Sequence, residues 1–161
     1  SGNSMTMSPD SLFISEPTVF DVARYILEKL GELSTMKLQK LCYYAQAWSL
    51  VWDDKPLFKE EFRAWANGPV CKELFRQTQG RFSVTASDEP GSSDNLTEEQ
   101  KDTIDVVLDY YGSRNAQWLS QLSHMEAPWK EARAGIAPGV GSDNIITKES
   151  MAEYYSGLQN G

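Results

Sequence analysis

The chain has 161 residues, a length that suits one domain of ordinary size. Its 15 Lys and Arg residues stand against 23 Asp and Glu residues, and the formal net charge of −8 argues against partnership with nucleic acid or an anionic membrane surface. The sequence has no apolar run of the roughly 18 residues that a membrane span needs. Two cysteines and one histidine exclude a disulfide scaffold and a His-rich metal site, so we expect a cytoplasmic protein.

The first residues differ in character from the rest of the chain. The stretch SGNS before Met5 resembles the remnant of a cleaved purification tag, and residues 1–10 lack the basic start and apolar stretch of a signal peptide. We therefore expect residues 1–8 to be a disordered start and residues 9–161 to form a single domain.

The first two predicted helices supply most of the expected core. Residues 19–30 show helical spacing of apolar side chains, with Thr18 as the N-cap and Gly31 at the end. A second helix over about 36–52 is apolar around most of its circumference, which indicates a central position in the protein. Residues 57–66 alternate imperfectly and predict a short β element.

The rest of the chain reads as further helices joined by polar loops. The turn at Asn67 and Gly68 predicts a helix with Pro69 at its first position, and residues 83–95 read as a mobile polar loop. Further helices are expected after three caps, at Thr97, at Asn115 and at Thr147, with a short one from Pro128 and a second loop over 135–144. The expected fold is a mainly α, compact helical domain around the helix at about 36–52, with a minor β element near 57–66.

Two constellations of residues could carry chemistry. Cys71 is expected in the first turn of the helix from Pro69, where the helix dipole would lower its thiol pKa, and His124 is the one candidate base. Such a pair also needs an orienting group and an oxyanion hole, which the sequence does not reveal. A zinc site from Cys42, Cys71, His124 and one carboxylate is sufficient in ligand number, but it lacks the short Cys spacing of closed zinc sites. The alternative for both cysteines is simple packing in the core.

The tryptophans suggest a surface for protein contact. Five Trp side chains cannot all bury their indole N–H groups without hydrogen-bond partners. Trp65 and Trp129 each lie beside a Pro-containing turn and are our candidates for an aromatic docking surface, since Trp is enriched at interaction hot spots.

Three blocks of sequence together resemble the Panacea antitoxin domain, also called the SocA-like or GepA-like phage-associated family. They are MKLQKLCYYAQAW over 36–48, PLFKEEFRAWANGPV over 56–70 and SQLSHMEAPW over 120–129. The resemblance spans about residues 19–155. It implies a bacterial or prophage antitoxin that neutralises a cognate toxin by direct protein contact, with no enzymatic activity and no cofactor.

The resemblance also suggests which residues bind the partner. Polar side chains on the otherwise buried central helix, at Lys37, Gln39 and Lys40, are expected to have a specific partner, either inside the protein or on the toxin. The predicted partner-binding set is Lys37, Lys40, Tyr44, Trp65, Asn67, His124 and Trp129. The acidity of the chain favours a basic toxin. Direct DNA binding is not expected, and delivery of the toxin to a protease as an adaptor is the alternative role.

Overall fold

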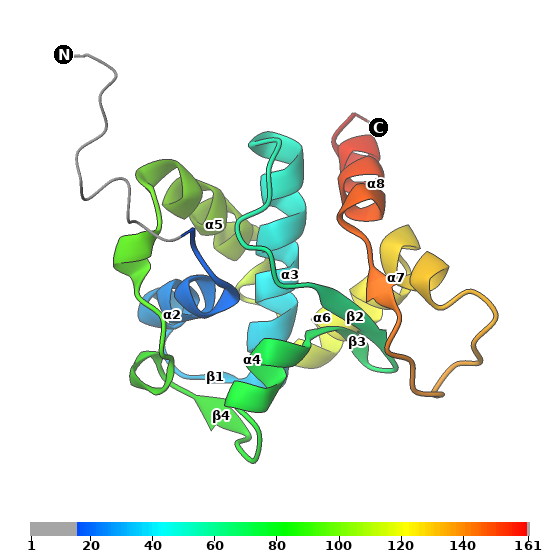
Figure 1. Cartoon of the computed structure of the whole chain (residues 1–161), viewed down its shortest axis with the longest axis horizontal. Helices are drawn as coiled ribbons and strands as arrows, with labels where there is room; N and C mark the ends of the chain where they lie inside the picture. Colours follow the sequence, from blue (N-terminus) through cyan, green and yellow to red (C-terminus); the bar gives the residue numbers. More distant parts are fainter. Residues whose placement is uncertain (1–15, 161) are drawn as a thin grey trace.

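The computed structural model describes residues 16–160, and it is mainly helical with two small sheets (Figure 1). The mainly α prediction is confirmed. Residues 1–8, expected to be a disordered start, lie outside the described residues. Within residues 16–160, every helix is either too short or too polar to cross a membrane.

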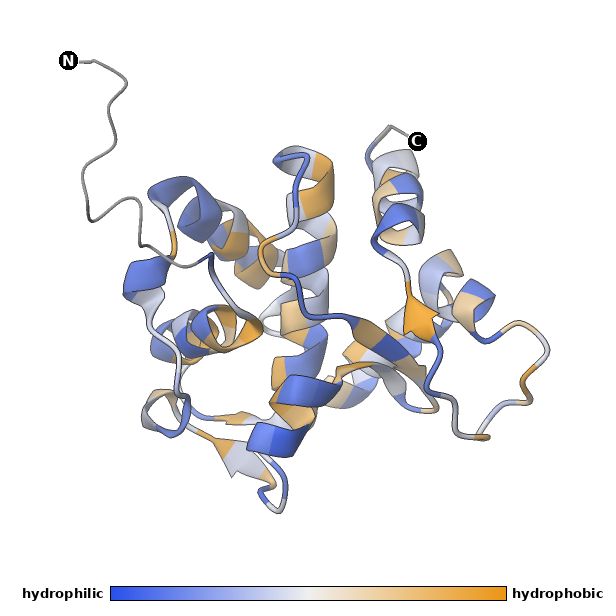
Figure 2. Ribbon diagram, in the orientation of Figure 1, coloured by the Kyte–Doolittle hydropathy of each residue, from blue (hydrophilic) through white to orange (hydrophobic). Residues whose placement is uncertain are grey.

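Helix α2, Val19–Leu30, follows the predicted bounds. Thr18 and Asp21 form a capping box at its start, and the Thr18 backbone N–H donates to the Asp21 carboxylate at 2.8 Å. The helix ends at Gly31, whose φ of 82° is a conformation that glycine adopts without a steric penalty. Its hydrophobic residues lie toward α3 (Figure 2).

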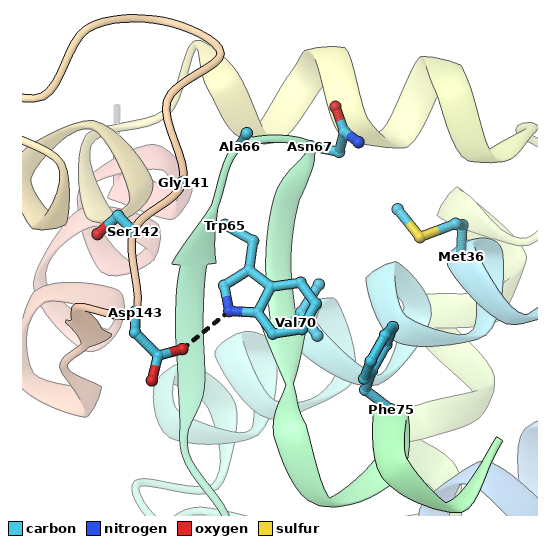
Figure 3. Close-up of a pocket in the computed structure, with 9 residues that line it drawn as sticks. All are labelled: Met36, Trp65, Ala66, Asn67, Val70, Phe75, Gly141, Ser142 and Asp143. Carbon is cyan, nitrogen blue, oxygen red and sulfur yellow. Dashed lines mark hydrogen bonds between the residues drawn. The ribbon is translucent and has the colours of Figure 1, made fainter. Parts of the chain in front are cut away.

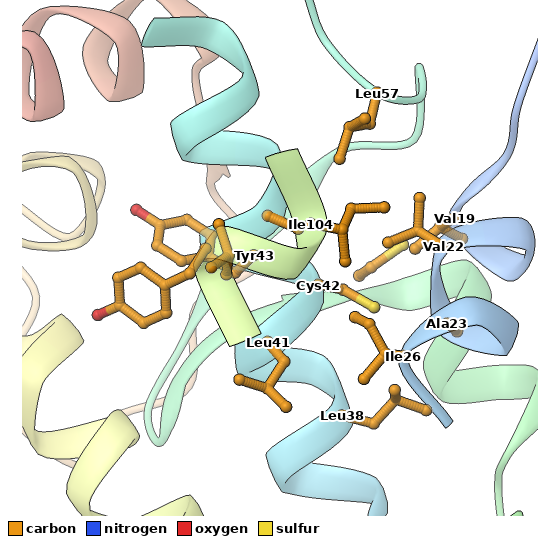
Figure 4. Packing of buried hydrophobic residues seen from close by; sticks show 14 of the residues in the cluster. Val19, Val22, Ala23, Ile26, Leu38, Leu41, Cys42, Tyr43, Leu57 and Ile104 are labelled. Atoms are coloured by element: carbon orange, nitrogen blue, oxygen red, sulfur yellow. The ribbon is translucent and has the colours of Figure 1, made fainter. Parts of the chain in front are cut away.

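Helix α3, Thr35–Trp52, is the central helix that the sequence predicts. It begins with the Ser34 side chain accepting a hydrogen bond from the Lys37 backbone N–H, and it contacts α2, α5, α6, α8 and β3. Leu38, Leu41 and Cys42 meet the apolar side of α2 and Ile104 of α5 in a closely packed core (Figure 4). Burial on all sides explains why its sequence lacks a wide polar face.

A three-stranded antiparallel sheet lies against the N-terminal half of α3. Strands β2, Phe62–Trp65, and β3, Gly68–Cys71, form a hairpin, and β5, Ile145–Ile146, pairs with the other edge of β2. A second sheet pairs β1, Leu33–Ser34, with β4, Ser83–Val84. The predicted β element near 57–66 is confirmed for β2, whereas β1, β3, β4 and β5 are not apparent from the sequence.

The helix predicted from Pro69 is wrong in its first residues. Pro69 lies within β3, opposite Ala64, and helix α4 begins only at Lys72 and runs to Gln77. Cross-strand pairing with β2 and a contact from α3 keep residues 68–71 extended. Local sequence signals do not include such tertiary contacts.

The segment expected as a polar loop over 83–95 contains β4 and two short 3₁₀ helices, Ala86–Asp88 and Ser93–Asn95. The Asp21 carboxylate anchors it by accepting hydrogen bonds from the Ser92 backbone at 2.8 Å and the Asn95 side chain at 3.1 Å. This part of the chain is thereby held against the start of α2.

The C-terminal half consists of helices whose caps are those that the sequence predicts. Thr97 and Gln100 form a capping box before α5, Asn115 caps α6, and the Thr147 hydroxyl accepts from the Ser150 backbone at the start of α8. A short helix, α7, starts with Pro128 in its first turn and ends before the loop that leads to β5. The bounds are α5, Glu98–Tyr111; α6, Ala116–His124; α7, Ala127–Ala132; and α8, Lys148–Asn160.

Candidate functional site

The β2–β3 hairpin forms the centre of the candidate site. Trp65 pairs with Gly68 across a turn made by Ala66 and Asn67. Gly68 has a φ of 115°, and a Cβ atom there would lie 2.7 Å from Cε of Lys40. Only glycine therefore fits between the turn and the side chain packed beneath it.

Two of the predicted partner-binding residues lie inside the protein, under this hairpin. Lys40 and Tyr44 are fully buried, which removes both from any surface that another protein can reach. The Lys40 ammonium donates to the Pro69 carbonyl at 3.3 Å, and burial lowers the pKa of Lys40 to about 7. The Tyr44 hydroxyl donates to the Glu126 carboxylate at 2.7 Å. The prediction that these two side chains contact a partner is therefore corrected. They support the hairpin and the start of α7 from inside the protein.

The polar residues of α3 have internal partners. Gln39 accepts from the Cys71 backbone N–H at 2.8 Å and donates to the Cys71 carbonyl at 3.0 Å. Two turns later Gln46 repeats the arrangement, accepting from the Leu57 N–H at 2.7 Å and donating to the Phe58 carbonyl at 2.8 Å. Each glutamine amide thus supplies the donor and the acceptor that a paired strand would offer to the extended segment beside it. The choice between an internal partner and the toxin is thus decided for Gln39 in favour of the internal one.

Lys37 also has an internal contact, but it remains half-buried near the surface. Its ammonium donates to the Gly112 carbonyl at 2.6 Å, at the end of α5. Burial lowers the pKa of Lys37. This contact joins the start of α3 to the end of α5.

A hollow of about 620 Å³ opens beside the hairpin (Figure 3). Its floor is apolar, with Val70 beneath the Trp65 ring and with Met36 and Phe75 on the far side. The Trp65 ring meets Phe75 edge to face, with centroids 4.8 Å apart. On the opposite rim, the Trp65 indole N–H donates to the Asp143 carboxylate at 3.1 Å.

Asp143 fastens the loop after α7 to the hairpin. Besides the Trp65 indole, its carboxylate accepts from the Lys72 ammonium at 2.8 Å, and its carbonyl accepts from Arg63 at 3.0 Å. The hydrogen bonds from Lys72 and Trp65 lower the pKa of Asp143. The rim of the hollow is therefore held by charged groups while its floor is apolar, as in protein-binding surfaces.

A second hollow of about 440 Å³ continues along α6. It shares Met36 and Asn67 with the first, so the two form one depression that passes over the hairpin turn. We call this depression the hairpin groove. Its α6 side is polar and is lined by Gln117, Ser120, Gln121 and His124.

His124, at the end of α6, and Trp129, in α7, pack beside the hairpin turn. Their rings stack with centroids 4.1 Å apart, and the Trp129 indole N–H donates to the Trp65 carbonyl at 2.9 Å. The Ser120 hydroxyl donates to the Asn67 carbonyl. The structure thus gathers Trp65, Asn67, His124 and Trp129 of the predicted partner-binding set around one turn.

Comparison with protein families decides what kind of chain carries this groove. The family described as antitoxin SocA-like, Panacea domain, matches residues 38–130, which is more than half of the sequence. The chain belongs to the SocA-like Panacea antitoxin family. No curated protein and no solved structure shows a significant match.

The matched Panacea region, residues 38–130, begins near the start of α3 and ends within α7. It includes the hairpin and α6. Glu126 lies in it and was not among the residues that the sequence singled out. The Glu126 carboxylate is buried and accepts from both the Tyr44 and the Tyr155 hydroxyl at 2.7 Å. Its place in the SHMEAPW block, two residues after His124, was the available signal.

The groove residues Met36, Phe75 and Asp143 were also missed. Phe75 and Asp143 come from α4 and from the loop before β5, and each reaches the hairpin only through the tertiary fold. The sequence offers no motif for such convergence.

The enzymatic hypothesis depends on a helix position that Cys71 does not occupy. Cys71 is the last residue of β3 and the N-cap of α4, so it is not in the first turn of a helix. Burial raises the pKa of the Cys71 thiol to about 12, and the nearby Glu73 carboxylate adds to the effect. Burial also lowers the pKa of His124, and the positive charges of Lys40 and Arg133 lower it further. A hydrogen bond with the Ala66 backbone has the opposite, smaller effect. The thiolate that a nucleophile requires is disfavoured here.

The zinc hypothesis finds no matching geometry among residues 16–160, where no group of three or more His, Cys, Asp and Glu side chains is arranged to hold a metal ion. Cys42 is fully buried between α3 and α2 (Figure 4). Its packing fits the alternative of a small core side chain.

Proposed function

We propose that this chain neutralises a cognate toxin by direct protein contact and that the hairpin groove is the contact surface. Family membership supports the antitoxin role in general. The observation that carries the surface assignment is the convergence of four predicted contact residues and an apolar floor around one exposed turn. Asn67 projects at that turn between the two hollows.

The physical character of the groove suits a polypeptide ligand. Trp65, Met36 and Phe75 provide apolar area that is only partly covered, and the amides of Gln117 and Gln121 provide donors and acceptors beside it. Hot spots at protein interfaces combine such aromatic anchors with a polar rim. Internal hydrogen bonds fix the positions of the Trp65 and Trp129 rings before a partner arrives, which reduces the entropy lost on binding.

The proposal is tested by co-expression with the toxin encoded beside this chain. Growth is expected to be restored and the two proteins to co-purify in a fixed ratio. Asn67→Arg, which adds bulk and charge at the turn, is expected to abolish rescue. Gln79→Arg, at an exposed position in the turn after α4 and outside the groove lining, is expected to retain it. A neighbouring gene product that is harmless alone, or that does not co-purify, would refute the proposal.

The same strains separate sequestration from delivery to a protease. A pulse–chase measurement of the toxin is expected to show a lifetime that is unchanged or longer when this chain is present. A shortened lifetime would instead indicate the adaptor role.

A further inference from the structure

Another hollow, of about 360 Å³, lies near the C-terminal end of α3, whereas the hairpin groove lies beside its N-terminal end. Its walls are aromatic: Trp48 and Trp52 of α3 stack with centroids 5.0 Å apart, and Tyr110 and Tyr111 of α5 meet edge to face at 4.7 Å. Glu126 completes the lining. We call this hollow the aromatic pocket.

Hydrogen bonds hold the walls of the aromatic pocket in place. The Trp48 indole N–H donates to the Tyr111 hydroxyl at 2.9 Å and joins α3 to α5. The Trp52 indole N–H donates to the Gln159 side chain at 2.7 Å and joins α3 to α8. These hydrogen bonds position the Trp48, Trp52 and Tyr111 rings without a ligand. Trp52 remains 41% exposed, and Tyr110 is 69% exposed.

Glu126 places a carboxylate at the base of this aromatic enclosure. The residue is 5% exposed, and its Oε1 atom accepts the hydroxyls of Tyr44 and Tyr155. Its other oxygen, Oε2, accepts a hydrogen bond from no donor of residues 16–160. A carboxylate has capacity for further donors, and no cationic side chain of the described part lies within salt-bridge distance of it. Desolvation raises the pKa of Glu126, a cost that a bound cation would offset.

The rim of the pocket has the same sign of charge. Asp102 and Asp109 lie one turn before and one turn after the exposed Val106 on α5, so they flank its outer edge. Both are exposed, and neither forms an ion pair with another residue of the described range. Two acidic groups thus lie along the α5 edge of an apolar entrance, an arrangement that is complementary to a basic segment with apolar neighbours.

One short stretch of chain, residues 122–126, contributes side chains to both the aromatic pocket and the hairpin groove. Leu122 and Glu126 line the pocket and His124 lines the groove, while Met125 between them is 68% exposed. Methionine adapts its shape to different partners. A polypeptide bound in the groove could continue across Met125 to the aromatic pocket.

We infer that the aromatic pocket binds an arginine side chain of the toxin, with the guanidinium between the aromatic walls and on the free face of the Glu126 carboxylate, and with apolar neighbours over Val106 and Leu158. Aromatic walls with a carboxylate are the arrangement that proteins use for organic cations. The inference rests on the proposed function only for the source of the arginine. Its test therefore uses synthetic peptides, so that failure to find a toxin and failure of the pocket are separate results.

The probes are two capped amphipathic peptides of leucine, alanine and glutamine. One carries a single central arginine, and the other carries citrulline, the neutral isostere of arginine, at that position. Isothermal titration calorimetry is expected to show binding of the arginine peptide about tenfold tighter than that of the citrulline peptide, the ratio that corresponds to about 1.4 kcal/mol.

Glu126→Gln is expected to abolish that preference, because the amide oxygen still accepts both tyrosine hydroxyls but the negative charge is lost. Glu131→Gln, an equal change of charge at an exposed position on α7, is expected to keep it. Tyr110→Ala, which removes an exposed ring, is expected to weaken binding of the arginine peptide several-fold. Equal binding of the two peptides by the unaltered protein, binding of neither, or a preference that survives Glu126→Gln would overturn the inference.

Discussion

Gln39 and Cys71 are 32 residues apart in the sequence, and the Gln39 side chain forms hydrogen bonds with both the backbone N–H and the carbonyl of Cys71. The contact keeps the end of β3 extended against α3. The hairpin that carries Trp65 is therefore fixed from the core of the protein, and the groove beside it has a defined shape.

Removing this contact is expected to destabilise the protein. Gln39→Ala leaves a buried donor and a buried acceptor of Cys71 unpaired, and we expect the free energy of unfolding to fall by about 2–4 kcal/mol. Urea denaturation followed by circular dichroism measures the change. Gln121→Ala, at an exposed position of α6, serves as the control and is expected to change stability by less than about 0.5 kcal/mol. A Gln39→Ala protein as stable as the parent would show that the contact contributes nothing to the fold.

Gly68 and Gly139 provide a matched pair for the geometry of the hairpin turn. Both have positive φ, 115° and 83°, but a Cβ atom on Gly68 would meet Lys40 at 2.7 Å, whereas one on Gly139 would meet nothing within 4 Å. Gly139→Ala is expected to cost about 1 kcal/mol from backbone strain alone. Gly68→Ala is expected to cost at least about 1 kcal/mol more, measured by thermal or urea unfolding. Equal losses for the two variants would mean that the packing of Lys40 under the turn is not restrictive.

Lys40 should make the stability of the protein depend on pH in a defined direction. Burial lowers its pKa from 10.5 to about 7 in the folded state. Between pH 7 and pH 10 the unfolded chain therefore holds a proton on Lys40 that the folded protein does not, and the free energy of unfolding rises with pH. Lys40→Met removes the contribution of Lys40 to this dependence. The contributions of the other titrating groups cancel when the free energies of unfolding of the two proteins are subtracted.

The difference in free energy of unfolding, parent minus Lys40→Met, is expected to increase by about 1.4 kcal/mol per pH unit across this range. Urea titrations at several pH values measure it. A difference that stays constant from pH 7 to pH 10 would contradict a depressed pKa for Lys40.

The parts of the fold that the sequence predicts are those with local causes. Thr18, Thr97 and Asn115 each cap their helix through a residue three positions away, so each helix start is visible in a short window of sequence. The predicted partner-binding set adds Trp65, Asn67, His124 and Trp129, which the structure brings to one turn.

The parts that the sequence does not predict depend on contacts between distant segments. Residues 68–71 have the local pattern of a helix start, and their extended form depends on pairing with β2 and on Gln39. Lys40 and Tyr44 look like surface groups by residue type, but they are buried because Pro69 and Glu126 supply their hydrogen bonds. A charged residue on a mostly apolar helix can either form a buried hydrogen bond or face solvent, and a single sequence does not distinguish the two positions.

The affinity of the toxin for two phenylalanine variants tests the central claim most directly. Phe75 lines the hairpin groove, and Phe82 is more exposed, at 86%, but lies outside it. The account predicts that Phe75→Asp weakens toxin binding at least about tenfold in calorimetric titration, while Phe82→Asp, with the same change in charge, leaves it unaltered. A folded Phe75→Asp protein that binds the toxin as tightly as the parent would contradict the assignment of the groove as the contact surface.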